Sequence, residues 1–198
     1  MWTVPNLLTL ARIVAVVPLV AFIDAGWWTA AFVLFIAAAV TDWLDGWLAR
    51  RWNQQSDLGR MLDPIADKLI VAAVLVALVL SYEELAMVAA VAIISRELVV
   101  AGLREFLGPK GIVIHVSRLA KWKTAAQMLA IGLILGGTAF AGFTPAPGHG
   151  AIVGSAPYQI SGAFVVAGWA SMAVAGLLTW ITAFAYLRAG LRHMEPPR

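Results

Sequence analysis

The stretch TDWLDGWLARRWNQQSDLGRMLDPIADKL, residues 41–69, carries four aspartates where two long apolar runs meet a short polar turn. Asp42 and Asp45 are three residues apart, and Asp63 and Asp67 are four apart. Each pair therefore lies on one face of a helix. Because a short turn joins the two helices, they are antiparallel neighbours. We predict that all four carboxylates converge between them.

The composition indicates that these helices lie in a membrane. Hydrophobic residues make up 62% of the 198 residues and charged residues 13%, against about 45–50% and 25% in soluble domains. A membrane-spanning helix needs about 20 mostly apolar residues. Runs of that kind cover residues 5–24, 27–50, 60–81, 85–106, 119–140 and 160–188. We expect an all-α, polytopic membrane protein with a single domain, residues 1–198, built as a bundle of six transmembrane helices.

The basic residues predict the orientation of this bundle, because Lys and Arg in short loops face the cytoplasm. The turns at residues 24–26, 81–84 and 141–159 contain neither, whereas the alternate connections and the C-terminus are rich in both. We therefore predict cytoplasmic termini and an active site facing the cytoplasm from the cell membrane. The net charge of +3 then reflects topology and contact with lipid headgroups, and no nucleic-acid partner is expected.

Four carboxylates inside a membrane boundary need compensating positive charge. Each ionised aspartate near the bilayer centre costs about 2.5–3.5 kcal/mol. Two divalent cations would neutralise four negative charges, and oxygen ligands favour Mg²⁺ or Mn²⁺. Ion pairs with Arg50 and Lys68 are the structural alternative. We predict a two-metal site whose ligands are Asp42, Asp45, Asp63 and Asp67.

Small residues share the surface of the acids. Gly46 and Ala49 follow the first aspartate pair along one helix, and Gly59 lies on the face of the second pair. Such residues leave room for a ligand or allow two helices to pack closely. Pro64 lacks an N–H, so we expect the third helix to start near it or to kink there.

The pattern D-x₂-D-G-x₂-A-R-x₈-G-x₃-D-x₃-D over residues 42–67 matches the CDP-alcohol phosphotransferase family without substitution. The segments PNLLTLAR (5–12), SRELVVAGLREF (95–106) and SRLAKWKTAAQM (117–128) resemble the bacterial phosphatidylglycerophosphate synthases of that family. The resemblance implies transfer of a phosphatidyl group from CDP-diacylglycerol to sn-glycerol 3-phosphate, with release of CMP. It also implies a homodimer.

Carried over position by position, the resemblance assigns roles to the residues of the pattern. The four aspartates would be metal ligands. Asp63 and Asp67 would be the catalytic pair, with Asp67 also the general base for the incoming hydroxyl. Arg50 suits a phosphate oxygen because its planar fork makes charge-assisted hydrogen bonds. The cytidine diphosphate pocket would be formed by Gly46, Ala49, Arg50 and Gly59.

A phosphorylated acceptor requires a second, cationic cluster. The candidates are Arg96, Arg104, Arg118 and Lys121. Arg96 is predicted inside a span, where it must pair with another group. Glu97 follows it directly, and adjacent residues on a helix do not face each other, so we expect Glu97 to contact a neighbouring helix. Arg12 and Lys123 are plausible further members of the site, and we predict them at its periphery.

Several alternatives stay open. Within the family, the acceptor could instead be inositol phosphate, serine or phosphatidylglycerol, although a basic cluster disfavours serine because it has no phosphate. Outside it, a divalent-cation transporter would also place acids inside a bundle, but its acids would be spread across the membrane depth. A purely structural membrane subunit would leave the buried charge unexplained.

Overall fold

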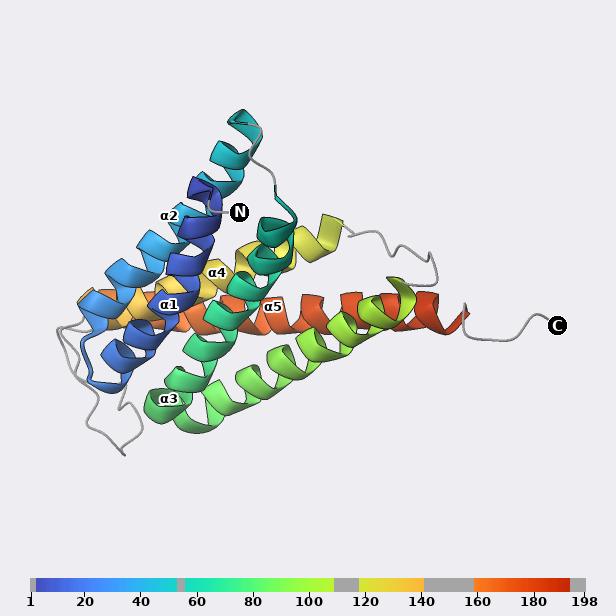
Figure 1. Ribbon diagram of the computed structural model, residues 1–198. Coiled ribbons are helices and arrows are strands. Elements are labelled where there is room, and N and C mark those ends of the chain that lie inside the picture. Colours follow the sequence, from blue (N-terminus) through green and yellow to red (C-terminus); the bar gives the residue numbers. More distant parts are fainter. Residues whose placement is uncertain (1–2, 53–55, 109–117, 141–158, 193–198) are drawn as a thin grey trace.

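The computed structural model describes residues 3–52, 56–108, 118–140 and 159–192, and within these residues the fold is all-helical with no strand (Figure 1). This confirms the predicted fold class. The helices are α1 (Val4–Asp24), α2 (Trp28–Arg51), α3 (Asp57–Leu107), α4 (Arg118–Phe140) and α5 (Gln159–Arg192).

Helix α3 consists of two helical arms that meet at Glu83. That residue has φ 45° and ψ −120°, which is not a helical conformation. A straight helix of 51 residues would measure about 76 Å, more than twice the thickness of a hydrocarbon core of about 30 Å. Figure 1 shows the chain changing direction sharply between the two arms. The break falls between the third and fourth predicted spans, where a turn was expected.

The surface of the bundle supports a multi-pass membrane protein. Within the described residues, five helices are long and apolar enough to cross a membrane. Large apolar side chains lie on the outside of the bundle, with Val17 73% exposed, Val88 70% and Phe184 70%. Such a surface suits lipid tails rather than water. We predicted six separate spans, and that count and the cytoplasmic termini stay predictions.

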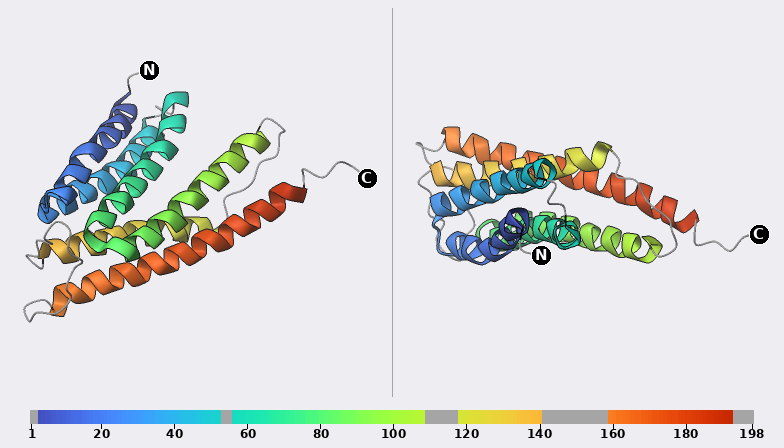
Figure 2. Two further views of the ribbon diagram at one scale, coloured as in Figure 1. Left: turned by 90° about the horizontal axis from the view of Figure 1, so that it is seen from below. Right: turned by 45° about the horizontal axis from the view of Figure 1, so that its top comes forward.

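The helices pack as two groups that share the core. Helix α1 lies against both α2 and α3, while α4 and α5 form the most extensive pair (Figure 2). Contacts of α2 with α4 and of α3 with α5 join the groups, whereas α3 and α4 touch only sparsely. The largest fully buried side chains include Leu19, Phe35, Ile70, Leu78, Ile134 and Met172.

The start of α3 is tied to α1 through a capping serine. Ser56 Oγ accepts a hydrogen bond from the Gly59 N–H at 3.0 Å and donates one to Asn6 Oδ1 at 2.9 Å. The first bond satisfies an N–H that has no partner within the helix. Because the cap lies at Ser56, the helix starts seven residues before Pro64, and the backbone stays helical through that proline. The expected helix start near Pro64 was wrong, and the alternative, a kink at Pro64, stays a prediction.

Candidate functional site

The four predicted carboxylates do converge, and they gather around Arg12 and Thr9 of α1. Arg12 Nη1 donates to Asp42 and, at 2.8 Å, to Asp67, and Arg12 Nη2 donates to Asp45. Thr9 Oγ1 donates to Asp63 Oδ1 at 2.9 Å and approaches Asp45 Oδ2 at 3.4 Å. We refer to Asp42, Asp45, Asp63 and Asp67 together as the acid cluster.

Arg12 is central to the site, so its predicted peripheral position was wrong. Its side chain is almost fully buried, with 3% of the residue exposed. The structural alternative of a basic side chain among the acids is thus realised by Arg12, for which the sequence analysis did not propose it. Lys68 is exposed, and the side chain of Arg50 lies outside the described residues.

The face of α1 that meets the acids carries a polar stripe. Asn6, Thr9 and Arg12 follow one another at intervals of three, and they are 2%, 1% and 3% exposed. Residues at this spacing lie along one side of a helix. The sequence signal that would have identified α1 as part of the site is the recurrence of a polar residue every three positions in an otherwise apolar span.

The acid cluster has more negative charge than its described partner neutralises. Among the described side chains, Arg12 forms ion pairs with three of the four aspartates, Asp42, Asp45 and Asp67. Carboxylate oxygens are the ligands that Mg²⁺ and Mn²⁺ prefer, so the donor set fits these ions chemically. In the present arrangement, however, no three described histidine, aspartate or glutamate side chains are placed to hold one ion together. Several of the oxygens are instead bonded to Arg12 and Thr9.

The space beside Gly59 is filled by polar side chains. A Cβ atom added at Gly59 would lie 2.8 Å from Asn6 Oδ1 and 3.3 Å from Ser56 Oγ. Here the small residue allows two helix ends to approach closely, which was the structural alternative for it. Gly46 and Ala49 are partly buried on α2. The predicted nucleotide-binding roles of these three residues stay predictions.

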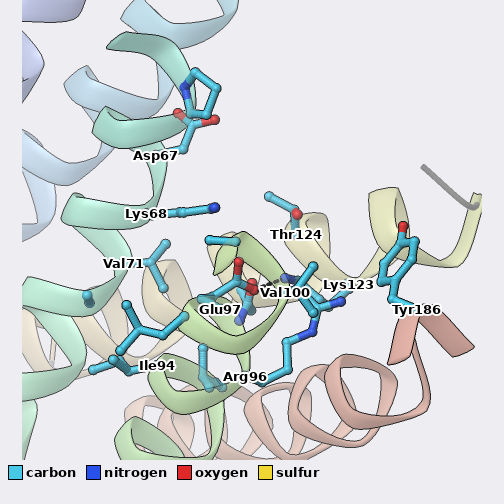
Figure 3. Close-up of a pocket in the computed structure, with 16 residues that line it drawn as sticks. Asp67, Lys68, Val71, Ile94, Arg96, Glu97, Val100, Lys123, Thr124 and Tyr186 are labelled. Carbon is cyan, nitrogen blue, oxygen red and sulfur yellow. Dashed lines mark hydrogen bonds and ion pairs between the residues drawn. The ribbon is translucent and has the colours of Figure 1, made fainter. Parts of the chain in front are cut away.

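A second region, the basic pocket, lies in the gap where α3 and α4 touch sparsely. It has a volume of about 310 Å³, and its walls come from both arms of α3, from α4 and from α5 (Figure 3). Its charged lining residues are Asp67, Lys68, Arg96, Glu97 and Lys123. Asp67 is thus a member of the acid cluster and also part of the pocket wall. The two regions are continuous at this residue.

Arg96 is held in the basic pocket by three hydrogen bonds, which confirms the expectation that it pairs with other groups. Its Nε donates to the Thr179 carbonyl at 2.9 Å, its Nη2 donates to Thr182 Oγ1 at 2.6 Å, and its Nη1 donates to Glu97 Oε1 at 3.0 Å. These bonds use three of the five N–H groups of a guanidinium. The expectation that Glu97 would not pair with Arg96 was wrong, because the long arginine side chain reaches its sequence neighbour.

Lys123 also belongs to the lining of the basic pocket rather than to the periphery, which corrects its predicted position. Its Nζ donates to Glu97 Oε1 across the gap between α4 and α3. Glu97 therefore contacts a neighbouring helix, as expected. One carboxylate thus holds two cations, Arg96 and Lys123, within the same pocket.

Gln127 is a pocket residue that the sequence analysis missed. It is 3% exposed and lines the pocket, and within the described part of the chain its Nε2 has no hydrogen-bond partner. An unpaired buried donor costs about 1–3 kcal/mol, so a ligand with an acceptor oxygen would relieve that cost. Gln127 lies four residues after Lys123 and hence on the same face of α4. That spacing is the signal that could have identified it.

Three predicted acceptor-binding side chains cannot be compared with this geometry. Arg104 lies on the second arm of α3, and Arg118 and Lys121 lie at the start of α4. Their side chains are outside the described part of the chain, so their roles stay predictions.

Comparison with known proteins agrees with the sequence pattern. The family model for CDP-alcohol phosphatidyltransferase matches residues 2–181. A CDP-diacylglycerol–glycerol-3-phosphate 3-phosphatidyltransferase from Cereibacter sphaeroides is 46% identical over 145 residues, which cover 69% of this chain and 65% of that protein. A protein of the same name from Pseudomonas fluorescens is 37% identical over 199 residues, which cover 97% of this chain and 92% of that protein.

A relative with a different name also matches. The cardiolipin synthase (CMP-forming) of Oryza sativa is 41% identical over 149 residues, which cover 67% of this chain and 45% of that protein. The matched segments therefore span less than two thirds of the Cereibacter and Oryza proteins but nearly all of the Pseudomonas protein. Because the family model covers most of the chain, the family follows directly from it. The chain belongs to the CDP-alcohol phosphatidyltransferase family.

Proposed function

We propose that this protein transfers the phosphatidyl group of CDP-diacylglycerol to sn-glycerol 3-phosphate, giving phosphatidylglycerophosphate and CMP. The acceptor hydroxyl oxygen would form a bond to the phosphorus that carries the diacylglycerol. The bond from that phosphorus to the bridging oxygen of the diphosphate would break, and CMP would leave with the electron pair. The observation that carries this proposal is the position of Asp67, which joins the acid cluster to the basic pocket.

The acid cluster is suited to hold two divalent cations, Mg²⁺ or Mn²⁺. Asp42, Asp45, Asp63 and Asp67 would be the ligands, and the excess of negative charge around Arg12 supports this assignment. When bound, such ions supply electrostatic stabilisation of the charge on diphosphate oxygens. Asp67 faces the basic pocket as well, so it is the carboxylate best situated to accept the proton of an acceptor hydroxyl.

The donor nucleotide would lie beside the acid cluster. Gly46, Ala49, Arg50 and Gly59 are the proposed residues, with Arg50 donating hydrogen bonds to a phosphate oxygen. A nucleotide that approaches Gly59 has to contact the Asn6 side chain, because Asn6 Oδ1 already fills the space next to this glycine. Asn6 is therefore a further candidate for contact with the nucleotide.

The acceptor phosphate would bind in the basic pocket. Arg96 and Lys123 are already positioned there by Glu97, and Lys68 extends into the same space in Figure 3. Gln127 carries a donor that no described residue pairs. A phosphate dianion offers acceptor oxygens to all of them and is attracted by their charge. The sequence-predicted residues Arg104, Arg118 and Lys121 would extend this set.

The proposed topology follows from the break in α3. If each arm of α3 crosses the bilayer, the chain has six spans, both termini are cytoplasmic, and the acid cluster opens toward the cytoplasm of the cell membrane. Both substrates could then arrive without crossing the bilayer, the acceptor from the cytoplasm and CDP-diacylglycerol from the surrounding lipid. A homodimer is proposed from the family resemblance alone.

Release of CMP from CDP-diacylglycerol tests the reaction. Purified protein is incubated with CDP-diacylglycerol, Mn²⁺ and one acceptor at a time: sn-glycerol 3-phosphate, inositol phosphate, serine or phosphatidylglycerol. We expect CMP with sn-glycerol 3-phosphate, loss of activity in EDTA, and recovery when Mn²⁺ or Mg²⁺ is restored. If no acceptor released CMP, the transferase assignment would be wrong.

One second candidate has a specific observation in its favour. The similarity to the Oryza protein named cardiolipin synthase makes phosphatidylglycerol the alternative acceptor, which would give cardiolipin and CMP. This acceptor has no terminal phosphate dianion for the basic pocket to bind. CMP release with phosphatidylglycerol but not with sn-glycerol 3-phosphate would favour the second candidate.

A further inference from the structure

Arg12 lies among the aspartates of the acid cluster and forms ion pairs with three of them. Its Nη1 is shared between Asp42 on α2 and Asp67 on α3, and its Nη2 bonds Asp45. One guanidinium on α1 thus links carboxylates from α2 and α3, the two helices against which α1 packs. Its Nε is buried and has no hydrogen-bond partner among the described residues. The side chain is therefore held by its contacts with the acids and not by bonds to the backbone of α1.

The guanidinium and a divalent cation would compete for the same oxygen atoms. The Oδ1 atoms of Asp42 and Asp67 and the Oδ2 atom of Asp45 accept hydrogen bonds from Arg12, and an ion held by these aspartates would need oxygens of the same carboxylates. The charge balance also predicts competition between Arg12 and the cations. Two divalent ions would already neutralise four negative charges, and the added guanidinium would repel them.

We propose that Arg12 is a positioning residue that acts as an internal counter-ion. It holds Asp42, Asp45 and Asp67 together while no divalent cation is bound, and it gives up their oxygens when the cations bind. This inference rests on the metal site of the proposed function. It adds that the protein keeps its acid cluster assembled between metal-binding events and that metal affinity includes the cost of displacing Arg12.

The test compares Arg12→Gln and Arg12→Lys with the unaltered protein, without using catalytic activity. Thermal unfolding is measured in EDTA and in saturating Mn²⁺, and Mn²⁺ affinity is measured by electron paramagnetic resonance of the free ion. For Arg12→Gln we expect a lower unfolding midpoint in EDTA, because Asp42, Asp45 and Asp67 lose their counter-ion and repel one another. We expect Mn²⁺ to restore most of that loss. Mn²⁺ should also bind about tenfold more tightly than to the unaltered protein, since losing a charge-assisted competitor contributes a factor of this order.

The other variants make the result specific. Arg12→Lys keeps the charge but cannot bridge two helices with a planar fork, so its Mn²⁺ affinity should fall between those of the unaltered protein and Arg12→Gln. Arg188→Gln removes an exposed arginine of α5 and should leave both measurements unchanged.

Two outcomes would overturn the inference. The first is unchanged or weaker Mn²⁺ binding in Arg12→Gln. The second is failure of that variant to fold even with Mn²⁺ present throughout purification, because the metal would then not replace the guanidinium. If the unaltered protein bound no Mn²⁺ at all, the proposed metal site itself would be wrong, which is a separate failure.

Discussion

The acid cluster and the basic pocket are opposite arrangements of charge that meet at one residue. In the described structure, the cluster places one cation, Arg12, among four aspartates. The pocket sets Lys68, Arg96 and Lys123 against Asp67 and Glu97. Neither region is balanced by its described side chains, and the imbalances have opposite signs. This difference supports the proposal that the acid cluster binds divalent cations and the basic pocket binds a phosphate.

The largest expected effect comes from a member of the acid cluster. Asp63→Asn removes a carboxylate charge at nearly constant volume and should lower turnover by about 100- to 1,000-fold, the range found when one preorganised electrostatic group is lost. The fold should survive, so the thermal midpoint in EDTA should stay close to that of the unaltered protein. Steady-state CMP release and thermal unfolding measure the two quantities.

Asp24→Asn provides the control for this prediction. Asp24 is exposed at the end of α1, far along that helix from Arg12, so its variant should keep full activity. Full activity in Asp63→Asn would show that Asp63 has no catalytic role and would contradict the proposed role of the acid cluster.

A smaller effect is expected from the basic pocket, where a substitution should change the KM for the acceptor alone. Lys123→Gln should raise KM for sn-glycerol 3-phosphate about 10- to 100-fold, because a hydrogen bond to a charged group contributes about 1.5–3 kcal/mol. KM for CDP-diacylglycerol and the affinity for Mn²⁺ should not change. Lys123→Arg, which keeps the charge, should lose less. An equal rise in KM for both substrates would mean that Lys123 supports the fold and does not bind the acceptor.

Gln127→Leu tests the unpaired donor of the pocket. Its Nε2 has no partner in the described structure, so the substitution should leave stability unchanged or higher. It should raise KM for sn-glycerol 3-phosphate about fivefold, the effect of one neutral hydrogen bond. Thermal unfolding and acceptor titration separate the two effects. Lower stability with an unchanged KM would show that the amide has a structural partner.

The smallest expected effect comes from a packing change between α4 and α5, which tests whether strain there alters metal binding in the acid cluster. A Cβ atom at Gly168 of α5 would lie 2.7 Å from Ile134 Cγ1 and 3.0 Å from Ile134 N on α4, so Gly168→Ala should lower stability by about 1–3 kcal/mol. Gly176→Ala is the matched control on the same helix, because nothing lies within 4 Å of its added Cβ. Mn²⁺ affinity should change in neither variant, since the four aspartates of the acid cluster lie on α2 and α3 and not on α4 or α5. A large change in Gly168→Ala would show that the regions are mechanically coupled.

Much of the fold was predictable because apolar runs of membrane length are unambiguous in a sequence. The ends of α1 and α2 lie within about two residues of their predicted positions. The start of α3 was not predicted, because Pro64 is the stronger local signal. The actual start depends on Ser56, whose hydroxyl also bonds Asn6 of a distant helix. A contact between helices far apart in the sequence has no local signal.

The site was predicted where residue spacing determines geometry and missed where tertiary packing does. The convergence of the four aspartates follows from intervals of three and four on neighbouring helices. Arg12 was placed at the periphery because nothing near it in the sequence shows that α1 packs against both α2 and α3. The Arg96–Glu97 contact was excluded by an argument from helix geometry that holds for short side chains. A guanidinium on a flexible stem reaches farther.

The burial of Arg12 also has a consequence for biosynthesis. Helix α1 is synthesised before Asp42 and Asp45, which lie 30 and 33 residues later, and well before Asp67, 55 residues later. An arginine alone in the hydrocarbon would cost about 2.5–3.5 kcal/mol. We therefore expect α1 and α2 to insert as a hairpin, with the ion pairs formed during translation. The residue that gathers the acids in the finished protein would also guide the first two helices into the bilayer.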